Sequence, residues 1–174
     1  MGRRRRYKIL KGRIRTGDVI MFYGVIHESG KGYTLYHGSN KDIKSDYLKP
    51  KNNSHEDDDY VFATPDKYFA LCYSGKIWNS KGMNLSKYNG KIVLTELKKE
   101  YINKTYNTDG YLYTVKDNGS FQKRGNLELL SKEPVEILSK EHIDNILKEL
   151  ESSSGVELYY YPNKPKWWDR VKGK

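Results

Sequence analysis

The chain has very little cysteine, and this scarcity excludes several classes of protein. Among 174 residues Cys72 is the single cysteine, so the chain can form neither an internal disulfide framework nor a cysteine-rich zinc site. Long hydrophobic runs are also missing. The longest, Val19 to Tyr23, resumes at Val25-Ile26 and is far shorter than the roughly 20 residues that span a bilayer. We therefore expect no membrane partner and a reducing compartment.

Two further absences concern leader peptides and phosphate loops. Arg3 to Arg6 are basic, like the start of a signal peptide, but a polar stretch follows in place of an apolar core. The sequence also contains no glycine-rich phosphate loop of the P-loop or Rossmann type. The missing apolar core predicts a cytoplasmic protein. The missing glycine-rich loop predicts that any ligand site differs from a P-loop or Rossmann site.

Positive charge is concentrated at the two ends of the chain. The formal net charge is +10. Residues 1–17 hold eight Arg or Lys and no acid, and residues 162–174 hold five against Asp169, so these ends carry +12 and residues 18–161 carry −2. This pattern favours a nearly neutral body with basic arms over a uniformly basic nucleic-acid binder. We expect an arm at 1–17, a single domain at 18–161 and a basic aromatic tail at 162–174.

Short apolar segments separated by turn residues predict that most of the domain consists of strands. The first two are expected to pair as a hairpin, and the polar residues 49–59 are expected to form a loop. The predicted strands are Asp18–Ile26, Tyr33–His37, Tyr60–Ala63, Lys91–Leu97, Gly110–Val115, Leu127–Leu130, Val135–Leu138 and Val156–Tyr161.

Two segments have helical spacing. In the first, Thr64 is the expected cap, Pro65 the first helical residue and Asp66 a partner of the helix dipole, and Gly75 is the stop signal. The second begins at Ser139 and has apolar residues at i, i+3, i+4 and i+7: Ile143, Ile146, Leu147 and Leu150. Many strands with two or three short helices indicate an α+β fold.

The first motif with chemical interest is Tyr36-His37-Gly38-Ser39. Glycine has no side chain, so the backbone at Gly38 can approach a planar ligand closely. The alternative interpretation is a histidine at the end of a strand with ordinary hydrogen bonds.

A second motif is the strand Val61-Phe62-Ala63 that leads into the first helix, where Tyr73 can stack on an aromatic ligand. Tyr60 and Val61 are neighbours in this strand and therefore point to opposite faces of the sheet. The alternative is that Phe62, Phe69, Cys72 and Tyr73 all belong to the hydrophobic core.

Glu128 is the third feature, because it lies between Leu127 and Leu129 at the start of an apolar strand. Alternation puts its carboxylate on the face opposite both leucines. The alternative is a glutamate on an edge strand that faces solvent. Glu133 and Glu136 are weaker candidates, because one lies in a turn and the other follows Pro134.

In this order and spacing, the three motifs resemble those of the ADP-ribosyltransferase family, of the poly(ADP-ribose) polymerase and rifampicin ADP-ribosyltransferase type. The resemblance covers roughly residues 33–150 and implies an ADP-ribosyltransferase-like split β-sheet core. Many members have a tyrosine where this chain has Val61. Either a bulge shifts the register there, or the site lacks that aromatic side chain.

The resemblance implies an NAD-dependent transferase that modifies a macromolecule, protein or nucleic acid, or an NAD glycohydrolase. NAD is then the ADP-ribose donor, Glu128 is the catalytic carboxylate, and no metal is required. The residues implied to bind NAD are His37, Gly38, Ser39, Tyr60, Phe62 and Tyr73. The composition, rich in Lys, Asn and Tyr, suits a low-GC bacterium or its phage. For a phage protein, the expected compartment is the host cytoplasm.

Two other functions remain open. One is a catalytically inactive nucleic-acid-binding module on the same fold, with contacts through residues 1–15 and 159–174, where rings and cations alternate near the C-terminus. The aromatic tail could instead pack on the domain. The other is an RNA 2′-phosphotransferase, which shares the fold, but its basic phosphate contacts are not recognisable. The acidic segment after His55 is interpreted as a solvated loop, and Cys72 and His142 have no triad partners.

Overall fold

A computed structural model describes residues 34–52, 58–76, 83–96, 98–125, 127–160 and 163. The predicted arm, the strand at 18–26 and the tail apart from Asn163 lie outside the described residues, as does most of the acidic segment after Asn52. The described residues are mixed α+β, as the sequence predicts.

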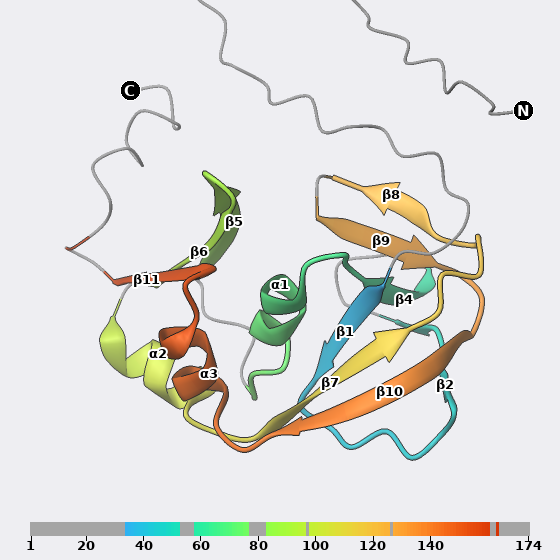
Figure 1. Cartoon of the computed structure of the whole chain (residues 1–174), viewed down its shortest axis with the longest axis horizontal. Coiled ribbons are helices and arrows are strands. Elements are labelled where there is room, and N and C mark those ends of the chain that lie inside the picture. Colours follow the sequence, from blue (N-terminus) through green and yellow to red (C-terminus); the bar gives the residue numbers. More distant parts are fainter. Residues whose placement is uncertain are drawn as a thin grey trace, which may run out of the picture.

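Eleven strands and three helices make up the described part of the chain (Figure 1). In chain order they are β1 (Leu35–Ser39), β2 (Tyr47–Leu48), β3 (Lys51–Asn52), β4 (Asp59–Ala63), α1 (Lys67–Cys72), β5 (Asn84–Tyr88), β6 (Lys91–Glu96), α2 (Lys99–Tyr106), β7 (Gly110–Val115), β8 (Gln122–Arg124), β9 (Glu128–Ser131), β10 (Val135–Ile143), α3 (Ile146–Ser152) and β11 (Val156–Tyr160).

Two four-stranded sheets form the larger part of the fold. Their strand orders are β1-β7-β10-β2 and β3-β4-β9-β8, and every pair within them is antiparallel. An isolated bridge between Tyr36 of β1 and Thr64, just after β4, connects the two sheets. Beyond this bridge the strands separate.

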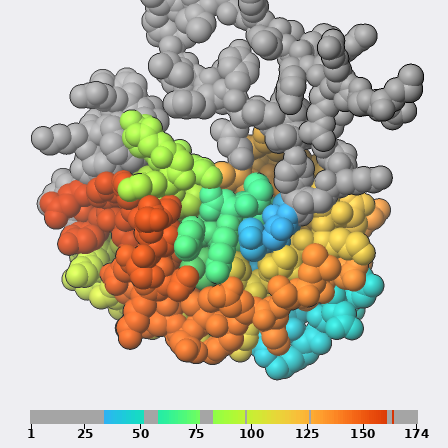
Figure 2. Space-filling model, viewed as in Figure 1, coloured from blue at the N-terminus to red at the C-terminus, as the bar shows by residue number. Residues whose placement is uncertain are grey.

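Alternation along the strands supplies two hydrophobic cores. Leu35, Val61 and Val115 belong to the core between the two four-stranded sheets. Leu112 and Ile143 face the other way, into a second core with buried residues of α1, α2 and α3. Helix α1 lies between β1 and α3 on the face that Figure 2 displays. Strands β1 and β7 therefore contact a core on each face of the first sheet, whereas residues 138–142 of β10 are exposed.

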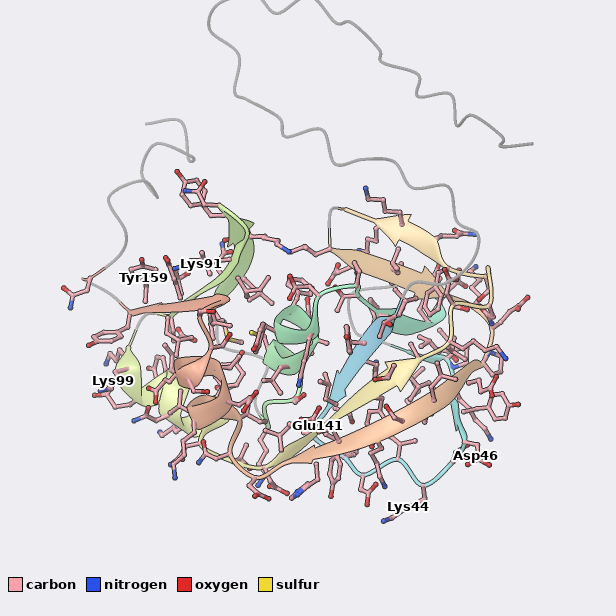
Figure 3. All side chains as sticks on the ribbon, viewed as in Figure 1. Lys44, Asp46, Lys91, Lys99, Glu141 and Tyr159 are labelled. Atoms are coloured by element: carbon pink, nitrogen blue, oxygen red, sulfur yellow. The ribbon has the colours of Figure 1, made fainter. Side chains whose placement is uncertain are left out.

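A third sheet has the order β11-β6-β5, and its pair of β6 and β11 is parallel. Three buried residues of β6, Ile92 to Leu94, have at most 1% of their surface exposed. Figure 3 labels Lys91 and Tyr159 at this sheet. Both donate hydrogen bonds to the carboxylate of Glu157, over 2.9 and 2.8 Å. The bond from Lys91 ties β6 to β11, whereas the bond from Tyr159 lies within β11.

Helix α1 begins two residues later than its sequence pattern predicts. Asp66, and not Thr64, is the N-cap, because its carboxylate accepts hydrogen bonds from the backbone N–H groups of Tyr68 and Phe69. Thr64 instead extends the strand and exchanges backbone hydrogen bonds of 2.8 and 2.9 Å with Tyr36. The prediction of a Thr64 cap was wrong, because this pairing between sheets holds Thr64 in an extended conformation.

The predicted helix start at Ser139 was also wrong. Strand β10 continues through Ser139 to Ile143 beside β7, with a register irregularity between Ile137 and Ser139. The helix begins only after Asn145, whose side chain accepts a hydrogen bond from the backbone N–H of Lys148.

Several described elements have no counterpart in the sequence-based prediction. They are the helix α2 and the strands β2, β3, β5 and β8. None of the helices in the described part of the chain is long and apolar enough to cross a membrane.

Candidate active site

The candidate site lies where β1 and β4 separate. Tyr36 exchanges both of its backbone hydrogen bonds with Thr64, so its N–H and C=O point away from β7. Gly38 is two residues further along the same strand, and its backbone groups therefore point to the same edge. Among the described residues, no hydrogen bond to Gly38 is found on this edge. One donor and one acceptor are thus available there.

Gly38 is also a contact point between β1 and α1. A Cβ atom at this position would lie 1.9 Å from the backbone oxygen of Ala70 and 2.7 Å from the hydroxyl of Ser74. Such distances are far below van der Waals contact, so any larger residue would push α1 away. Glycine therefore permits close approach as expected, but the partner seen here is the helix.

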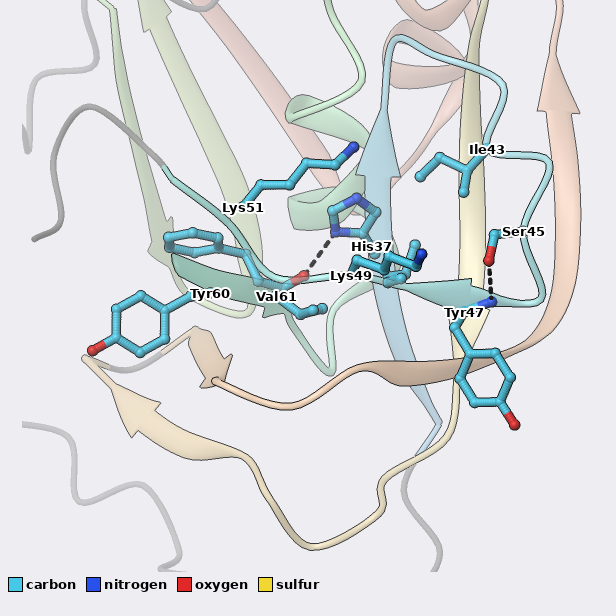
Figure 4. A pocket seen from close by; sticks show the side chains of 10 residues that line it. His37, Ile43, Ser45, Tyr47, Lys49, Lys51, Tyr60 and Val61 are labelled. Atoms are coloured by element: carbon cyan, nitrogen blue, oxygen red, sulfur yellow. Dashed lines mark hydrogen bonds between the residues drawn. The ribbon is translucent and has the colours of Figure 1, made fainter. Parts of the chain in front are cut away.

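The next residue to consider is His37, whose Nδ1 lies 2.8 Å from the carbonyl oxygen of Phe62 (Figure 4). A carbonyl only accepts, so Nδ1 must donate, and Nε2 of the neutral ring is left as an acceptor. Burial lowers the pKa of His37, and the positive charge of Lys51 lowers it further, against an opposing effect of the Phe62 hydrogen bond. The imidazole is therefore neutral at neutral pH.

Glu128, the first residue of β9, contacts the end of α1. The hydroxyl of Tyr73 donates a 2.6 Å hydrogen bond to Oε1 of Glu128. Nε of Arg124, on the neighbouring strand β8, lies 3.9 Å from Oε2. Burial raises the pKa of Tyr73, and the neighbouring Glu128 raises it further. The Tyr73 phenol therefore stays protonated and can donate its hydrogen bond at neutral pH. Of the two Glu128 carboxylate oxygens, Oε1 contacts the Tyr73 hydroxyl and Oε2 lies near Arg124.

These groups line one hollow of about 230 Å³, called here the Glu128 hollow. Three segments that are far apart in the sequence converge on it. Its lining consists of Tyr36, His37, Gly38, Phe62, Ala63, Thr64, Phe69, Ala70, Tyr73 and Glu128.

A second hollow of about 340 Å³, called here the Lys51 hollow, shares His37 and Phe62 with the first (Figure 4). In Figure 4 the Lys51 ammonium group points toward the His37 ring. Neither Lys49 nor Lys51 has an ion-pair partner among the described residues, although both line this hollow. Its other lining residues are Ile43, Ser45, Tyr47, Leu48, Tyr60 and Val61.

Not all predicted binding residues lie in the Glu128 hollow. Tyr60 lines only the Lys51 hollow, and Ser39 lines neither of the two. The Ser39 hydroxyl accepts a hydrogen bond from the backbone N–H of Lys41. Phe62 is only half-buried and lines both hollows, whereas Val61 is 2% exposed and belongs to the core.

The register of β4 shows whether a bulge places an aromatic side chain at the position of Val61. Val61, Phe62 and Ala63 pair in unbroken order with Ser131, Leu130 and Leu129 of β9. No bulge rotates an aromatic ring into the position of Val61, so the Glu128 hollow lacks a ring from this position.

Other reactive side chains in the described residues are poorly suited to catalysis. Cys72 is fully buried, and burial raises the pKa of its thiol far above neutral pH, which leaves no thiolate nucleophile. His142 is exposed and lies 3.5 Å from Asp109 and 3.2 Å from Asp144. Within the described ranges, no group of three or more His, Cys, Asp or Glu side chains could hold a metal ion.

Sequence reasoning missed Lys49, Lys51 and Arg124 as site residues. Lysine and arginine are common on surfaces, and only the fold brings Lys49 and Lys51 to the Lys51 hollow and Arg124 to within 3.9 Å of the Glu128 carboxylate. The Glu128 hollow thus combines a free backbone donor and acceptor with a carboxylate held by a phenol. Comparisons of the chain with protein-family models, with curated proteins and with solved structures found no match.

Proposed function

We propose that this protein consumes NAD and either transfers its ADP-ribose to a macromolecule or hydrolyses it. The observation that carries the proposal is the convergence of the three sequence motifs on one hollow, with Gly38, Tyr73 and Glu128 in its wall. The separation of two four-stranded sheets beside this hollow is compatible with the ADP-ribosyltransferase-like core that the motifs resemble.

The Glu128 hollow suits the nicotinamide half of NAD. A carboxamide needs one donor for its oxygen and one acceptor for its amino group, and the free edge of Gly38 offers both. The rings of Tyr73 and Phe69 pack edge to face with centroids 5.3 Å apart, so an aromatic wall is available for the pyridine ring.

The adenosine half then occupies the Lys51 hollow, which adjoins the first at His37. The free Nε2 of neutral His37 can accept a hydrogen bond from a ribose hydroxyl. The ammonium groups of Lys49 and Lys51, which have no ion-pair partner among the described residues, can neutralise the pyrophosphate. His37 and Phe62 thus line both halves of the proposed site.

The chemistry requires an anion beside the ribose. When the bond between C1′ and nicotinamide breaks, its electron pair leaves with nicotinamide and positive charge develops on the ribose. The carboxylate of Glu128 stabilises this charge. A hydroxyl, amine or water then attacks C1′, and its proton passes to Glu128 as general base or to solvent.

A second function has a specific observation in its favour. The buried Val61 and the unshifted register of β4 leave the Glu128 hollow without the ring that many family members have at this position. A module that binds nucleic acid without turnover fits this difference. NAD turnover distinguishes the two proposals.

The test compares Glu128→Gln with Glu133→Gln. Both changes remove one negative charge at nearly constant volume, but Glu133 is exposed in the turn after β9 and lines neither hollow. We expect Glu128→Gln to lower nicotinamide release about 10²-fold or more, while Glu133→Gln keeps wild-type activity. The measurement is free nicotinamide from NAD, together with labelled ADP-ribose on a cell extract as acceptor.

The result that contradicts the assignment is equal activity of the wild type and the folded Glu128→Gln variant. A wild-type protein that binds nucleic acid and releases no nicotinamide would support the inactive module instead.

A further inference from the structure

Tyr73 has a fixed place at the end of α1. It is the C-cap residue, and its backbone N–H donates to the carbonyl oxygens of Ala70 and Leu71. Residues 69–72 of this helix are buried, each with at most 5% of its surface exposed. The position of the Tyr73 ring is therefore set by the hydrophobic core.

The Tyr73 hydroxyl is the only described link between α1 and β9 that ends on the Glu128 carboxylate. The hydrogen bond joins residues 55 positions apart in the sequence, and its length of 2.6 Å is typical of a phenol that donates to a carboxylate. On the other side of the carboxylate, the Arg124 guanidinium lies at 3.9 Å, at the distance of a weak, partly exposed ion pair. The Tyr73 bond is therefore the stronger constraint on the Glu128 side chain.

We propose that Tyr73 is a positioning residue whose hydroxyl holds the Glu128 carboxylate in the orientation required for cleavage of NAD. The proposal rests on the proposed function. It separates two roles of one side chain. The ring forms part of the wall of the hollow, whereas the hydroxyl orients Glu128 relative to the backbone edge of Gly38. A free glutamate side chain samples several rotamers, and the hydrogen bond selects one of them.

Because the phenol remains protonated, it cannot act as the base in the reaction. Burial raises the pKa of Tyr73 and the hydrogen bond with Glu128 adds to this effect. Tyr73 donates its proton to Oε1 only as a hydrogen bond, and the lone pairs of Oε2 remain available to a ribose hydroxyl. One carboxylate oxygen is thus used for support and the other for chemistry.

Tyr73→Phe separates the two roles, since phenylalanine keeps the ring and lacks the hydroxyl. If the hydroxyl positions Glu128, kcat falls about 10- to 100-fold, the effect of one hydrogen bond to a charged group, and KM for NAD changes less than about twofold. The matched control is Tyr68→Phe in the same helix, whose hydroxyl has no described partner, and it keeps wild-type kinetics. An unchanged kcat in folded Tyr73→Phe overturns the proposal.

A double-mutant cycle in kcat provides a second measure. In the Glu128→Gln background, Tyr73→Phe should have little further effect, because the two residues act as one unit. Equal fold-losses in both backgrounds would mean that Tyr73 acts independently of Glu128 and would also overturn the proposal.

The same cycle in stability needs no turnover and therefore distinguishes failure of this proposal from failure of the proposed function. In urea unfolding, Tyr73→Phe should raise the unfolding constant about 10-fold in the wild type and clearly less in the Glu128→Ala background. If the two variants are coupled in stability but the wild type shows no NAD turnover, the hydrogen bond between Tyr73 and Glu128 exists and the catalytic role proposed for it is wrong. Absence of coupling would mean that the hydrogen bond is not formed in solution.

Discussion

His37 is held neutral in the folded chain, mainly because burial lowers the pKa of its imidazole. In the unfolded chain the ring titrates near its ordinary value of about 6.5. Between that pH and the lower folded value, the unfolded state binds a proton that the folded state does not. The free energy of unfolding therefore decreases as the pH falls below about 6.5, and this loss ends below the folded pKa.

The His37→Asn variant tests this account. Asparagine can still donate a side-chain hydrogen bond toward the Phe62 carbonyl, but it does not titrate. Urea unfolding of the wild type between about pH 7 and 5 should show stability falling toward acid, and His37→Asn should flatten the slope. His142→Asn is the control, because His142 is exposed. An equal slope in wild type and His37→Asn would contradict the assignment.

Single residues of the candidate site were partly predictable. His37, Gly38 and Glu128 stand in short motifs, and the fold brings all three to one hollow. Ser39 was expected in the same site, yet it lines neither hollow, since the strand alternates and its neighbour Gly38 takes the position facing α1. The roles of individual atoms, such as the Tyr73 hydroxyl, depend on contacts between distant segments that no local pattern contains.

At the scale of elements, α1 depends on one side chain for its start. Asp66 accepts hydrogen bonds of 3.1 Å from the backbone N–H groups of Tyr68 and Phe69, and its other oxygen accepts one of 2.6 Å from Lys87 of β5. The carboxylate therefore caps the helix and also connects it to the third sheet.

Asp66→Ala should lower the free energy of unfolding by about 1 to 2 kcal/mol, the usual cost of a lost N-cap. Lys87→Ala removes only the partly exposed ion pair and should cost less than about 1 kcal/mol. Both are measured by urea unfolding, with the exposed Asp46→Ala (Asp46 is labelled in Figure 3) as the control. A larger loss for Lys87→Ala than for Asp66→Ala would mean that the link between α1 and the third sheet matters more than the cap.

The helices and strands differ in how well the sequence pattern predicts their bounds. Strands β6 and β7 combine β-branched or aromatic residues with flanking turns, and their observed bounds differ from the predicted ones by at most one residue. The apolar spacing from Ile143 to Leu150 predicts one helix, but Ile143 ends a strand and Ile146 begins the helix. Helix α2 was missed because only three of its residues are buried and the rest are mostly polar.

For the whole molecule, the uneven distribution of charge leads to a separate prediction. Deletion of residues 1–12 and 162–174 removes eleven positive charges and one negative charge and leaves both hollows intact. If the ends recruit nucleic acid, the affinity for a single-stranded oligonucleotide should fall and its dependence on salt should flatten, because fewer counterions are released. Fluorescence anisotropy over a range of salt concentrations measures both effects.

The same truncated protein should keep wild-type NAD turnover. An unchanged salt slope would mean that nucleic acid binds elsewhere on the molecule. Loss of turnover in a folded truncated protein would mean that the ends contribute to the active site.

The parallel pair of β6 and β11 has a consequence for the order in which the chain folds. Val156 pairs with Ile92, so 63 residues must be made and arranged before this contact can form. Loop closure of this length is entropically costly and slow compared with a hairpin such as β8 and β9. During synthesis, the edge of β6 that pairs with β11 therefore stays open until residues 156–160 have left the ribosome. In that interval β6 is an open edge, at which a nascent chain can bind a chaperone or pair with a neighbour.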